Sequence, residues 1–423
     1  MSKGRIGYAG MTHLGLNSAV AAADRGYDVT CFDADAKLVA ALARGELPVV
    51  EPELPELLRK NTNRIKFTAD PQALAACGLV YVAPDVPTDD AGRSDLAGID
   101  ALVAKVDAAL PAGAVMVILS QVPPGYTRAR AKPGRILHYQ VETLIFGRAM
   151  ERARFPERFI VGCAAPAEPL PAALAEFLGS FGCPVLPMRY ESAELAKISI
   201  NFCLVAQVSV ANTLAELCES IGADWSEISP ALKLDKRIGP HAYLAPGLGI
   251  AGGNLERDLA TVRGIADLHG TDAGVVHAWM ANSRHRRDWA LRTLHREVLA
   301  RVDDPVIAVL GLAYKQDTHS IKNSPALALL ESLHPFRVQV FDPVVPSSVV
   351  SSSRALGAKT ELGACQGADA LAVMTPWPQF GKLDPAALAK CMKGNVVIDP
   401  YAVLSAGACR SAGLKHFTLG VRP

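Results

Sequence analysis

Short apolar runs alternate with helical stretches through the first 190 residues of the chain. Runs rich in β-branched and other apolar residues stand at 5–9, 28–33, 79–84, 114–120 and 158–163. Such runs, placed between helical segments, are typical of strands that are buried on both faces. The alternation therefore predicts a parallel sheet that is covered by helices on both sides.

One long helix is predicted at about 192–221, where apolar residues recur at helical spacing without an interrupting Pro or Gly. More helix follows to about Leu299, apart from a glycine-rich loop at 246–258. The long helix carries more apolar surface than one thin helical layer should bury. We therefore expect two subunits to pack along it as a homodimer.

The last third of the chain again has apolar runs that predict strands followed by turns, at 303–314, 338–343, 370–376 and 395–400. The predicted fold class is α/β, with two Rossmann-like, doubly wound parallel-sheet domains joined by a helical domain that contains the long central helix. The expected boundaries of the three domains are 1–190, 191–300 and 301–423.

Composition and charge argue against a nucleic-acid-binding or membrane-associated protein. Net charge is +1 over 423 residues with both signs interleaved, so neither nucleic acid nor a membrane surface is an expected partner. The basic run at 283–287 is interpreted as a solvated helix face. No signal peptide is recognised, and no stretch of about 18 uncharged apolar residues predicts a membrane span. Nine scattered cysteines without metal-ligand spacing indicate reduced, mostly buried thiols in a cytoplasmic protein with no metal.

A candidate dinucleotide site follows the first predicted strand. Gly10 suits a tight turn and Gly15 allows close helix–strand packing, so that an NAD pyrophosphate would rest on the helix N-terminus. Thr12 stands at the middle glycine of the G-x-G-x-x-G fingerprint. Asp33, at the end of the second strand, is placed for a ribose 2′-hydroxyl, which favours NAD over NADP. The alternative is a strand–turn–helix that binds no nucleotide.

Seven segments, in chain order, resemble the UDP-glucose/GDP-mannose dehydrogenase family. They are "RGELPVVEPEL" (44–54), "VPTDDAGRSDL" (86–96), "SQVPPGYT" (120–127), "SAELAKISIN" (192–201), "LDKRIGPH" (234–241), "PGLGIAGGNLERD" (246–258) and "GLAYKQDTHSIKNSPA" (311–326). Enzymes of this family use NAD to oxidise a sugar alcohol to a carboxylate in two hydride transfers. The resemblance implies an NAD-binding domain at 1–190, a dimerisation domain with the catalytic loop at 191–300 and a nucleotide-binding domain at 301–423.

The resemblance assigns roles to four residues. Lys197 and Asn201 fall on the family's catalytic lysine and asparagine, and their spacing of four puts both on one helix face. Lys197 would stabilise alkoxide charge, and Asn201 would orient the oxygen or a water. Asp258 falls on an aspartate thought to help activate water, and Glu142 on the glutamate of a P-E-F-L-R-E-G segment. The alternatives are a surface lysine with a helix-interior asparagine, a helix N-terminal acid and a solvated carboxylate.

Binding residues are implied in the same way. The cofactor residues are Gly10, Thr12, Gly15, Asp33, Thr88, Ser120 and Gln121, and the substrate residues are Arg237, Gly252, Gly253, Lys315 and Lys322. Several positions depart from the family. Gln121 replaces a threonine, Ile145 and Phe146 replace an arginine and a glutamate, and Tyr401 replaces an arginine. Fewer arginines weaken a bidentate grip on a diphosphate, so the substrate is expected to be a modified nucleotide sugar or to carry its phosphate differently.

The largest departure is Asn254, which stands at the family's catalytic cysteine. That cysteine attacks the aldehyde, and the resulting thiohemiacetal gives up the second hydride. A carboxamide has no nucleophilic lone pair at neutral pH. Cys203 lies two residues beyond Asn201, about 200° round the helix, and faces elsewhere. Asn254 is expected instead to hydrogen-bond the substrate hydroxyl or the product carbonyl.

Three hypotheses follow. The first is an NAD-dependent dehydrogenase that stops after one hydride transfer from a CH–OH group of a nucleotide-linked sugar or related phosphorylated substrate. The second keeps the four-electron oxidation but passes through an aldehyde hydrate, with Asp258 and Lys197 handling the water. The third is a catalytically silent homologue that binds nucleotide sugars. The number of NADH formed per substrate separates them.

Overall fold

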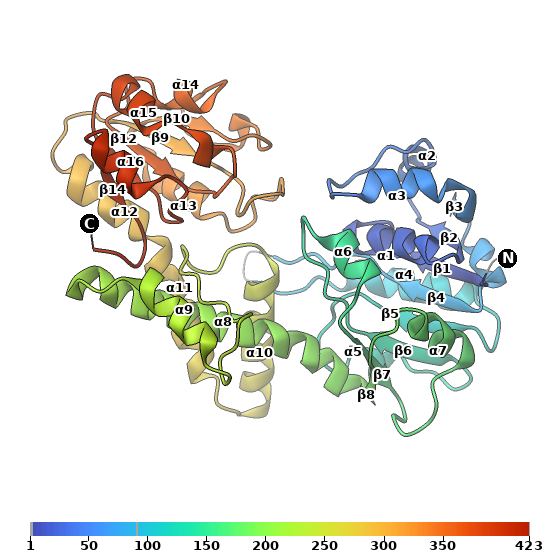
Figure 1. The fold of residues 1–423 in the computed structure, drawn as a ribbon. Coiled ribbons are helices and arrows are strands. Elements are labelled where there is room, and N and C mark those ends of the chain that lie inside the picture. The colour runs from blue at the N-terminus through green and yellow to red at the C-terminus, as the bar shows by residue number, and fades with distance from the viewer. Residues whose placement is uncertain (1–2, 90–91, 423) are drawn as a thin grey trace. The chain divides into compact units, whose positions relative to one another are not determined.

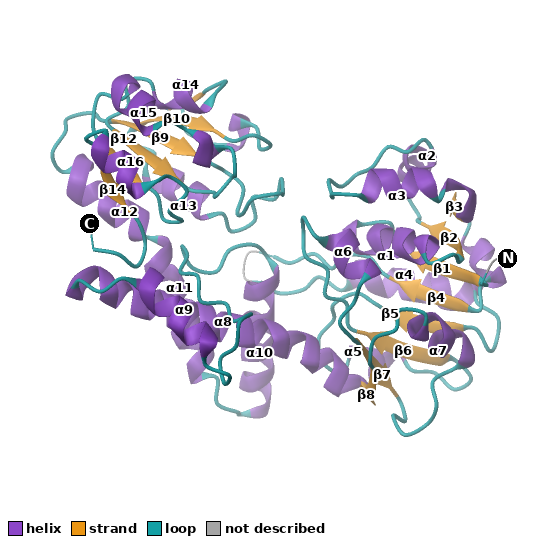
Figure 2. Cartoon of the chain, viewed as in Figure 1, coloured by secondary structure: helices purple, strands orange, loops and turns teal. Residues whose placement is uncertain are grey.

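The computed structural model describes residues 3–89 and 92–422. Its chain divides into two compact units, residues 1–200 and 201–423, and each unit is described by itself below. Figure 1 follows the chain from blue to red, and Figure 2 shows strands flanked by helices in both units. The expected α/β class, with two sheet domains and helices between them in the chain, is confirmed. The three domain boundaries stay a prediction.

The first unit contains an eight-stranded sheet in the order β3-β2-β1-β4-β5-β6-β7-β8. Its strands are β1 (Arg5–Ala9), β2 (Asp28–Phe32), β3 (Ile65–Thr68), β4 (Leu79–Val82), β5 (Val115–Ile118), β6 (Ile136–Gln140), β7 (Phe159–Cys163) and β8 (Val185–Arg189). The expectation of an all-parallel sheet is wrong at one place, because β7 pairs antiparallel with β6. The chain returns from β6 at the same sheet edge, so it needs no crossover helix there.

Helices cover both faces of this sheet. They are α1 (His13–Asp24), α2 (Ala36–Ala43), α3 (Leu54–Lys60), α4 (Ala97–Ala109), α5 (Tyr126–Arg130), α6 (Ala149–Arg154) and α7 (Ala172–Gly179), with 3-10 turns η1 (Thr62–Arg64) and η2 (Pro71–Ala76). Leu79 and Tyr81 of β4 pack in the core of α1, α3, α6 and α7, whereas Val80 and Val82 pack in the core of α4 and α5. This alternation is the signature of a strand buried on two faces.

The long helix α8 (Tyr190–Ile221) corresponds to the helix predicted at 192–221. By length and hydropathy alone it could cross a membrane, and 39% of its most apolar window is buried. The expectation of no membrane span was based on the lack of about 18 consecutive uncharged apolar residues, and α8 is long and apolar enough on average although polar residues interrupt it. A core helix of a soluble protein meets the same measures of length and hydropathy, so the feature is weak evidence of a membrane span.

The second unit begins within α8 at Asn201. It continues with α9 (Trp225–Leu234), α10 (Asn254–His269), α11 (Gly274–Arg287), α12 (Trp289–Leu294) and the π-helical turn η3 (His295–Leu299). A six-stranded, parallel sheet follows in the order β11-β10-β9-β12-β13-β14. Its strands are β9 (Val306–Leu310), β10 (Arg337–Phe341), β11 (Ala355–Gly357), β12 (Ala370–Val373), β13 (Val396–Ile398) and β14 (Lys415–Phe417). Its helices are α13 (Pro325–Ser332), α14 (Glu361–Cys365), α15 (Pro385–Cys391) and α16 (Ala406–Ser411), with 3-10 turns η4 (Ser347–Val349) and η5 (Phe380–Lys382).

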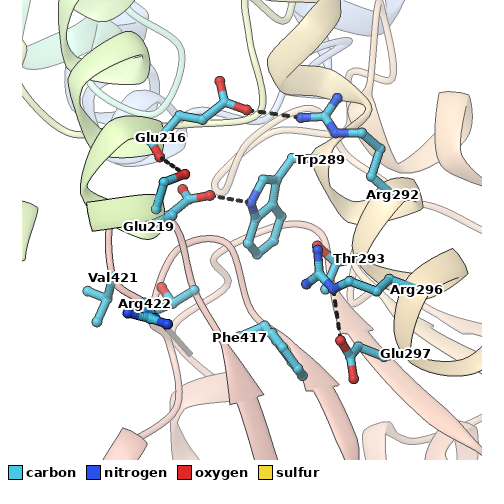
Figure 3. Close-up of a pocket in the computed structure, with 12 residues that line it drawn as sticks. Glu216, Glu219, Trp289, Arg292, Thr293, Arg296, Glu297, Phe417, Val421 and Arg422 are labelled. Atoms are coloured by element: carbon cyan, nitrogen blue, oxygen red, sulfur yellow. Dashed lines mark hydrogen bonds and ion pairs between the residues drawn. The ribbon is translucent and has the colours of Figure 1, made fainter. Parts of the chain in front are cut away.

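One arginine of the basic run at 283–287 lies inside the second unit. The Arg286 side chain is fully buried, although the run was expected to form a solvated face. Its Nη2 donates to Glu219 at 2.9 Å, and Nη1 lies 3.4 Å from Glu216. Glu219 also accepts from the Trp289 indole (Figure 3), beside a cavity of about 490 Å³. A buried guanidinium is tolerated here because two carboxylates of α8 neutralise it.

Candidate active site

The turn between β1 and α1 requires glycine at two positions. Gly10 has a φ of +92°, and a Cβ there would lie 2.8 Å from the Pro84 nitrogen. A Cβ on Gly15 would lie 1.9 Å from the Gly10 carbonyl oxygen. The lack of a side chain at Gly10 and Gly15 therefore allows helix and strand to lie close together, as the fingerprint of a dinucleotide site requires.

A cavity of about 320 Å³ opens at this turn, where the strand order of the sheet reverses between β1 and β4. Gly10, Thr12 and Asp33 line it together, as do Asp85 and Lys105. The Asp33 carboxylate accepts hydrogen bonds from the backbone amides of Met11 at 2.7 Å and Asp35 at 2.9 Å. A crevice at the switch point, with a fixed carboxylate after β2, fits NAD.

Four other expected cofactor residues lie outside the lining of this cavity, as far as the chain is described. Gly15 serves packing, and Thr88 forms a β-bridge with Ser94. The Ser120 hydroxyl, fully buried, donates to the Pro84 carbonyl at 2.5 Å. Gln121 follows it and is partly exposed. Their cofactor roles stay predictions.

Glu142 and Lys197 interact electrostatically within the first unit. Glu142 follows β6 and is partly exposed, and Lys197 lies in the second turn of α8. Burial among protein atoms raises the pKa of Glu142 above its usual value, while the Thr143 amide, which donates to it at 2.6 Å, and the charge of Lys197 oppose that rise. A carboxyl with a raised pKa beside a lysine is suited to accepting or holding a proton.

Asn201 and Asp258 meet directly in the second unit. Asn201 Nδ2 donates to Asp258 Oδ2 at 2.5 Å, and the two residues are 8% and 1% exposed. Arg257 Nε lies 3.4 Å from the other carboxylate oxygen. Asp258 lies in the second turn of α10, whereas the acid of the first turn is Glu256, and Asp258 is the partner of Asn201. Asn201 stands one helical turn after Lys197 on α8.

The glycine-rich loop is shaped by its own protein neighbours. A Cβ on Gly249 would lie 2.4 Å from the Ser283 carbonyl oxygen, and one on Gly252 would lie 3.0 Å from the Tyr314 ring. The Gly252 amide donates to the Lys322 carbonyl at 3.1 Å. This packing accounts for the glycine at 252 without a ligand, so substrate contact by Gly252 and Gly253 stays a prediction.

Asn254 is the first residue of α10, and its side chain is exposed. The helix N-terminus presents backbone amides at the position of the expected reaction. Glu256, in the same turn, accepts a hydrogen bond from Asn323, which also donates to the Gly252 carbonyl at 3.0 Å. The loop is thereby tied to the segment before α13.

The three cations expected to contact an anion in the second unit, Arg237, Lys315 and Lys322, have different neighbours. Arg237 is exposed and chelates Asp235, with Nε and Nη2 at 3.0 and 2.6 Å from its two oxygens. Lys315 Nζ lies 5.8 Å from the centre of the Tyr314 ring. Burial raises the pKa of Glu256, and the charge of nearby Lys322 opposes that rise without cancelling it.

Tyr401, at the family's arginine position, contacts the glycine-rich loop at 246–258. Its hydroxyl hydrogen-bonds with the Leu248 backbone, within the glycine-rich segment. Burial raises the pKa of this hydroxyl well above its usual value. The substitution thus replaces a cation with a buried contact that holds the loop.

A buried pair beside α1 was not predicted. His13 Nε2 lies 2.8 Å from Glu51 Oε1, and the His13 and Phe146 ring centres are 4.1 Å apart. Glu51 also accepts from the Gly147 and Ala149 amides. The available signals were a histidine inside the fingerprint and an acid within an otherwise apolar segment, but neither indicates its partner.

Comparisons with known proteins cover nearly all of the chain. Three family models of the UDP-glucose/GDP-mannose dehydrogenase family match: the NAD binding domain at 4–172, the central domain at 191–284 and the UDP binding domain at 308–406. A UDP-glucose 6-dehydrogenase of Pseudomonas aeruginosa is 30% identical, with 93% of this chain and 92% of that protein covered. UDP-glucose 6-dehydrogenase TuaD of Bacillus subtilis is 28% identical over 98% and 93%.

A solved structure gives the same result as the sequences. The solved structure of a UDP-glucose dehydrogenase from Pyrobaculum islandicum superposes with a TM-score of 0.86 at 25% identity. It covers 99% of this chain and 98% of that chain.

Proposed function

This chain belongs to the UDP-glucose/GDP-mannose dehydrogenase family, and we propose that, unlike the family's two-step oxidation, it removes a single hydride from an alcohol of a nucleotide-linked sugar or related phosphorylated substrate. NAD is the cofactor of this family's N-terminal domain, and the cavity at Gly10, Thr12 and Asp33 fits it. When bound, NAD supplies the hydride acceptor.

The chain's own residues provide the remaining chemistry. Lys197 would stabilise the negative charge that develops on the substrate oxygen, and Asn201 would orient that oxygen. Asp258 holds the Asn201 amide at 2.5 Å and so fixes its direction. Glu142, with its raised pKa, is suited to exchange the proton that the alcohol loses.

The observation that carries the single transfer is Asn254. It begins α10 at the position where the family has its nucleophilic cysteine. An amide forms no thiohemiacetal, so an aldehyde or ketone product has no covalent route to the acid. Asn254 instead offers an NH₂ group to a substrate or product oxygen.

The runner-up is a four-electron oxidation through an aldehyde hydrate. The buried Asp258 carboxylate favours it, because an acid beside Asn201 is suited to hold a water for addition to the aldehyde. A homologue that binds nucleotide sugars without turnover is the third outcome that the test distinguishes.

The test uses the full chain with NAD and a panel of nucleotide sugars. NADH absorbance should appear with at least one sugar, and Lys197→Ala should abolish it while NADH binding, measured by fluorescence, is retained. Lys66→Ala, an exposed lysine of β3, is the matched control and should leave turnover unchanged. Binding of sugars without NADH across the panel would instead identify a silent homologue.

We also propose that the chain forms a homodimer along α8. Val210, Leu214, Leu217 and Ile221 are 50, 40, 51 and 65% exposed and recur at spacings of four, three and four, so they form one apolar face. A second copy of the same face is a self-complementary cover. A cytoplasmic setting, where thiols stay reduced, fits nine free cysteines, six of them buried.

A further inference from the structure

The N-terminus of α1 is closed by a side chain of the chain itself. Asp85, directly after the turn that follows β4, accepts a hydrogen bond from the His13 amide through Oδ2 at 3.0 Å. The Asp85 amide in turn donates to the Thr12 hydroxyl at 2.8 Å. His13 is the first residue of α1 and Thr12 its N-cap, and the Thr12 side chain caps no helix amide, so Asp85 supplies the side-chain acceptor at this helix N-terminus.

This cap lies in the cofactor cavity. Thr12 and Asp85 both line it, and the Asp85 side chain is exposed. A dinucleotide pyrophosphate rests on the amides of this helix N-terminus in the fold. The His13 amide cannot donate fully to both a carboxylate and a phosphate, and two anions that share one donor would repel each other.

Two more charged side chains, Lys105 and Asp33, line the cofactor cavity. Lys105 of α4 lines the same space and is exposed. Asp33, which also lines the cavity, already accepts two backbone hydrogen bonds and stands after β2, at the place of a ribose contact. Asp85 is therefore the carboxylate that would meet the phosphates, and its hydrogen bonds with the His13 amide and the Thr12 hydroxyl hold it at the helix N-terminus.

We propose that Asp85 competes internally with the cofactor's pyrophosphate for the N-terminus of α1 and thereby sets the affinity of the site. The Asp85 carboxylate must break its hydrogen bond with the His13 amide before a dinucleotide places its pyrophosphate at the N-terminus of α1. The proposal rests on dinucleotide binding by this domain. It adds that this chain binds its cofactor more weakly than the same chain would without a carboxylate at position 85.

The test is a fluorescence titration of NADH into the wild-type chain, Asp85→Asn and Asp85→Ala. The amide of Asp85→Asn keeps the cap but removes the charge, whereas Asp85→Ala removes both. The NADH Kd should fall in the order wild type, Asp85→Asn, Asp85→Ala, with a total change of about tenfold, equivalent to about 1.4 kcal/mol. Glu46→Gln, an exposed acid elsewhere in the unit, should bind as the wild type does.

Calorimetry with ADP and adenosine identifies the cause. The gain in affinity should appear with ADP, which carries the pyrophosphate, and be absent with adenosine. Equal or weaker NADH binding by Asp85→Ala, with an unchanged melting temperature, would overturn the proposal. An equal gain with adenosine would overturn it also. Failure of the wild type and both variants to bind NADH at all would refute dinucleotide binding itself.

Discussion

The contact between Asn201 and Asp258 is expected to contribute measurably to stability. In Asn201→Ala the Asp258 carboxylate, 1% exposed, loses the donor that lies 2.5 Å away. A hydrogen bond to a charged group contributes about 1.5–3 kcal/mol. The loss should stay within that range, because Arg257 remains at 3.4 Å and keeps the carboxylate paired.

A second asparagine of α8 supplies the matched control. Asn212 is 1% exposed, and its Oδ1 accepts from the Gly247 amide at 2.8 Å, so its bond is neutral. Asn212→Ala removes the same atoms and should cost only about 0.5–1.5 kcal/mol for the lost bond. Urea unfolding of both variants, followed by circular dichroism, gives the comparison. A loss in Asn201→Ala no larger than that in Asn212→Ala would refute a charge-assisted contact.

Three further predictions follow from the same structure. Burial alone would raise the pKa of Glu51, but hydrogen bonds from His13 and the Gly147 and Ala149 amides lower it overall. The ionised form therefore stabilises the fold above the unfolded value of about 4.3, and this contribution is lost as pH falls through the lowered folded value. Glu51→Gln should show a smaller loss of urea midpoint on acidification, and an equal loss would contradict the assignment. Asn254→Cys should raise the NADH formed per substrate above that of wild type and of Asn254→Ser, because a thiol at a helix N-terminus ionises readily; an unchanged ratio would show that the position is not the nucleophile's. Leu217→Glu should convert a dimer to a monomer in light scattering, whereas the control Leu234→Glu, also exposed, should not.

The sequence predicted the elements that carry strong periodicity. The helix at 192–221 was recognisable because no Pro or Gly breaks it, and β1, β4, β5 and β9 because they are buried apolar runs. By contrast, β3 and β8 contain no fully buried residue, and β11 and β14 have three residues each. Such strands are set by their neighbours in the sheet, so their own residues give little signal.

The side-chain partnerships of the site were less predictable. The spacing of Lys197 and Asn201 is local and was readable, but the donor to Asp258 comes from 57 residues away. Asp85 reaches His13 across 72 residues, and Glu51 reaches it across 38. Arg286 is buried against Glu219, which lies 67 residues earlier in the chain on α8. Loops and helix ends bring these groups together, and hydrophobic periodicity carries no information about them.

The central claim is that Asn254 stops the oxidation after one hydride. Counting NADH against consumed nucleotide sugar, with the product identified by mass spectrometry, tests it most directly. We expect a ratio of one and a product two hydrogens lighter than the substrate. A ratio of two with a carboxylate product would contradict the claim.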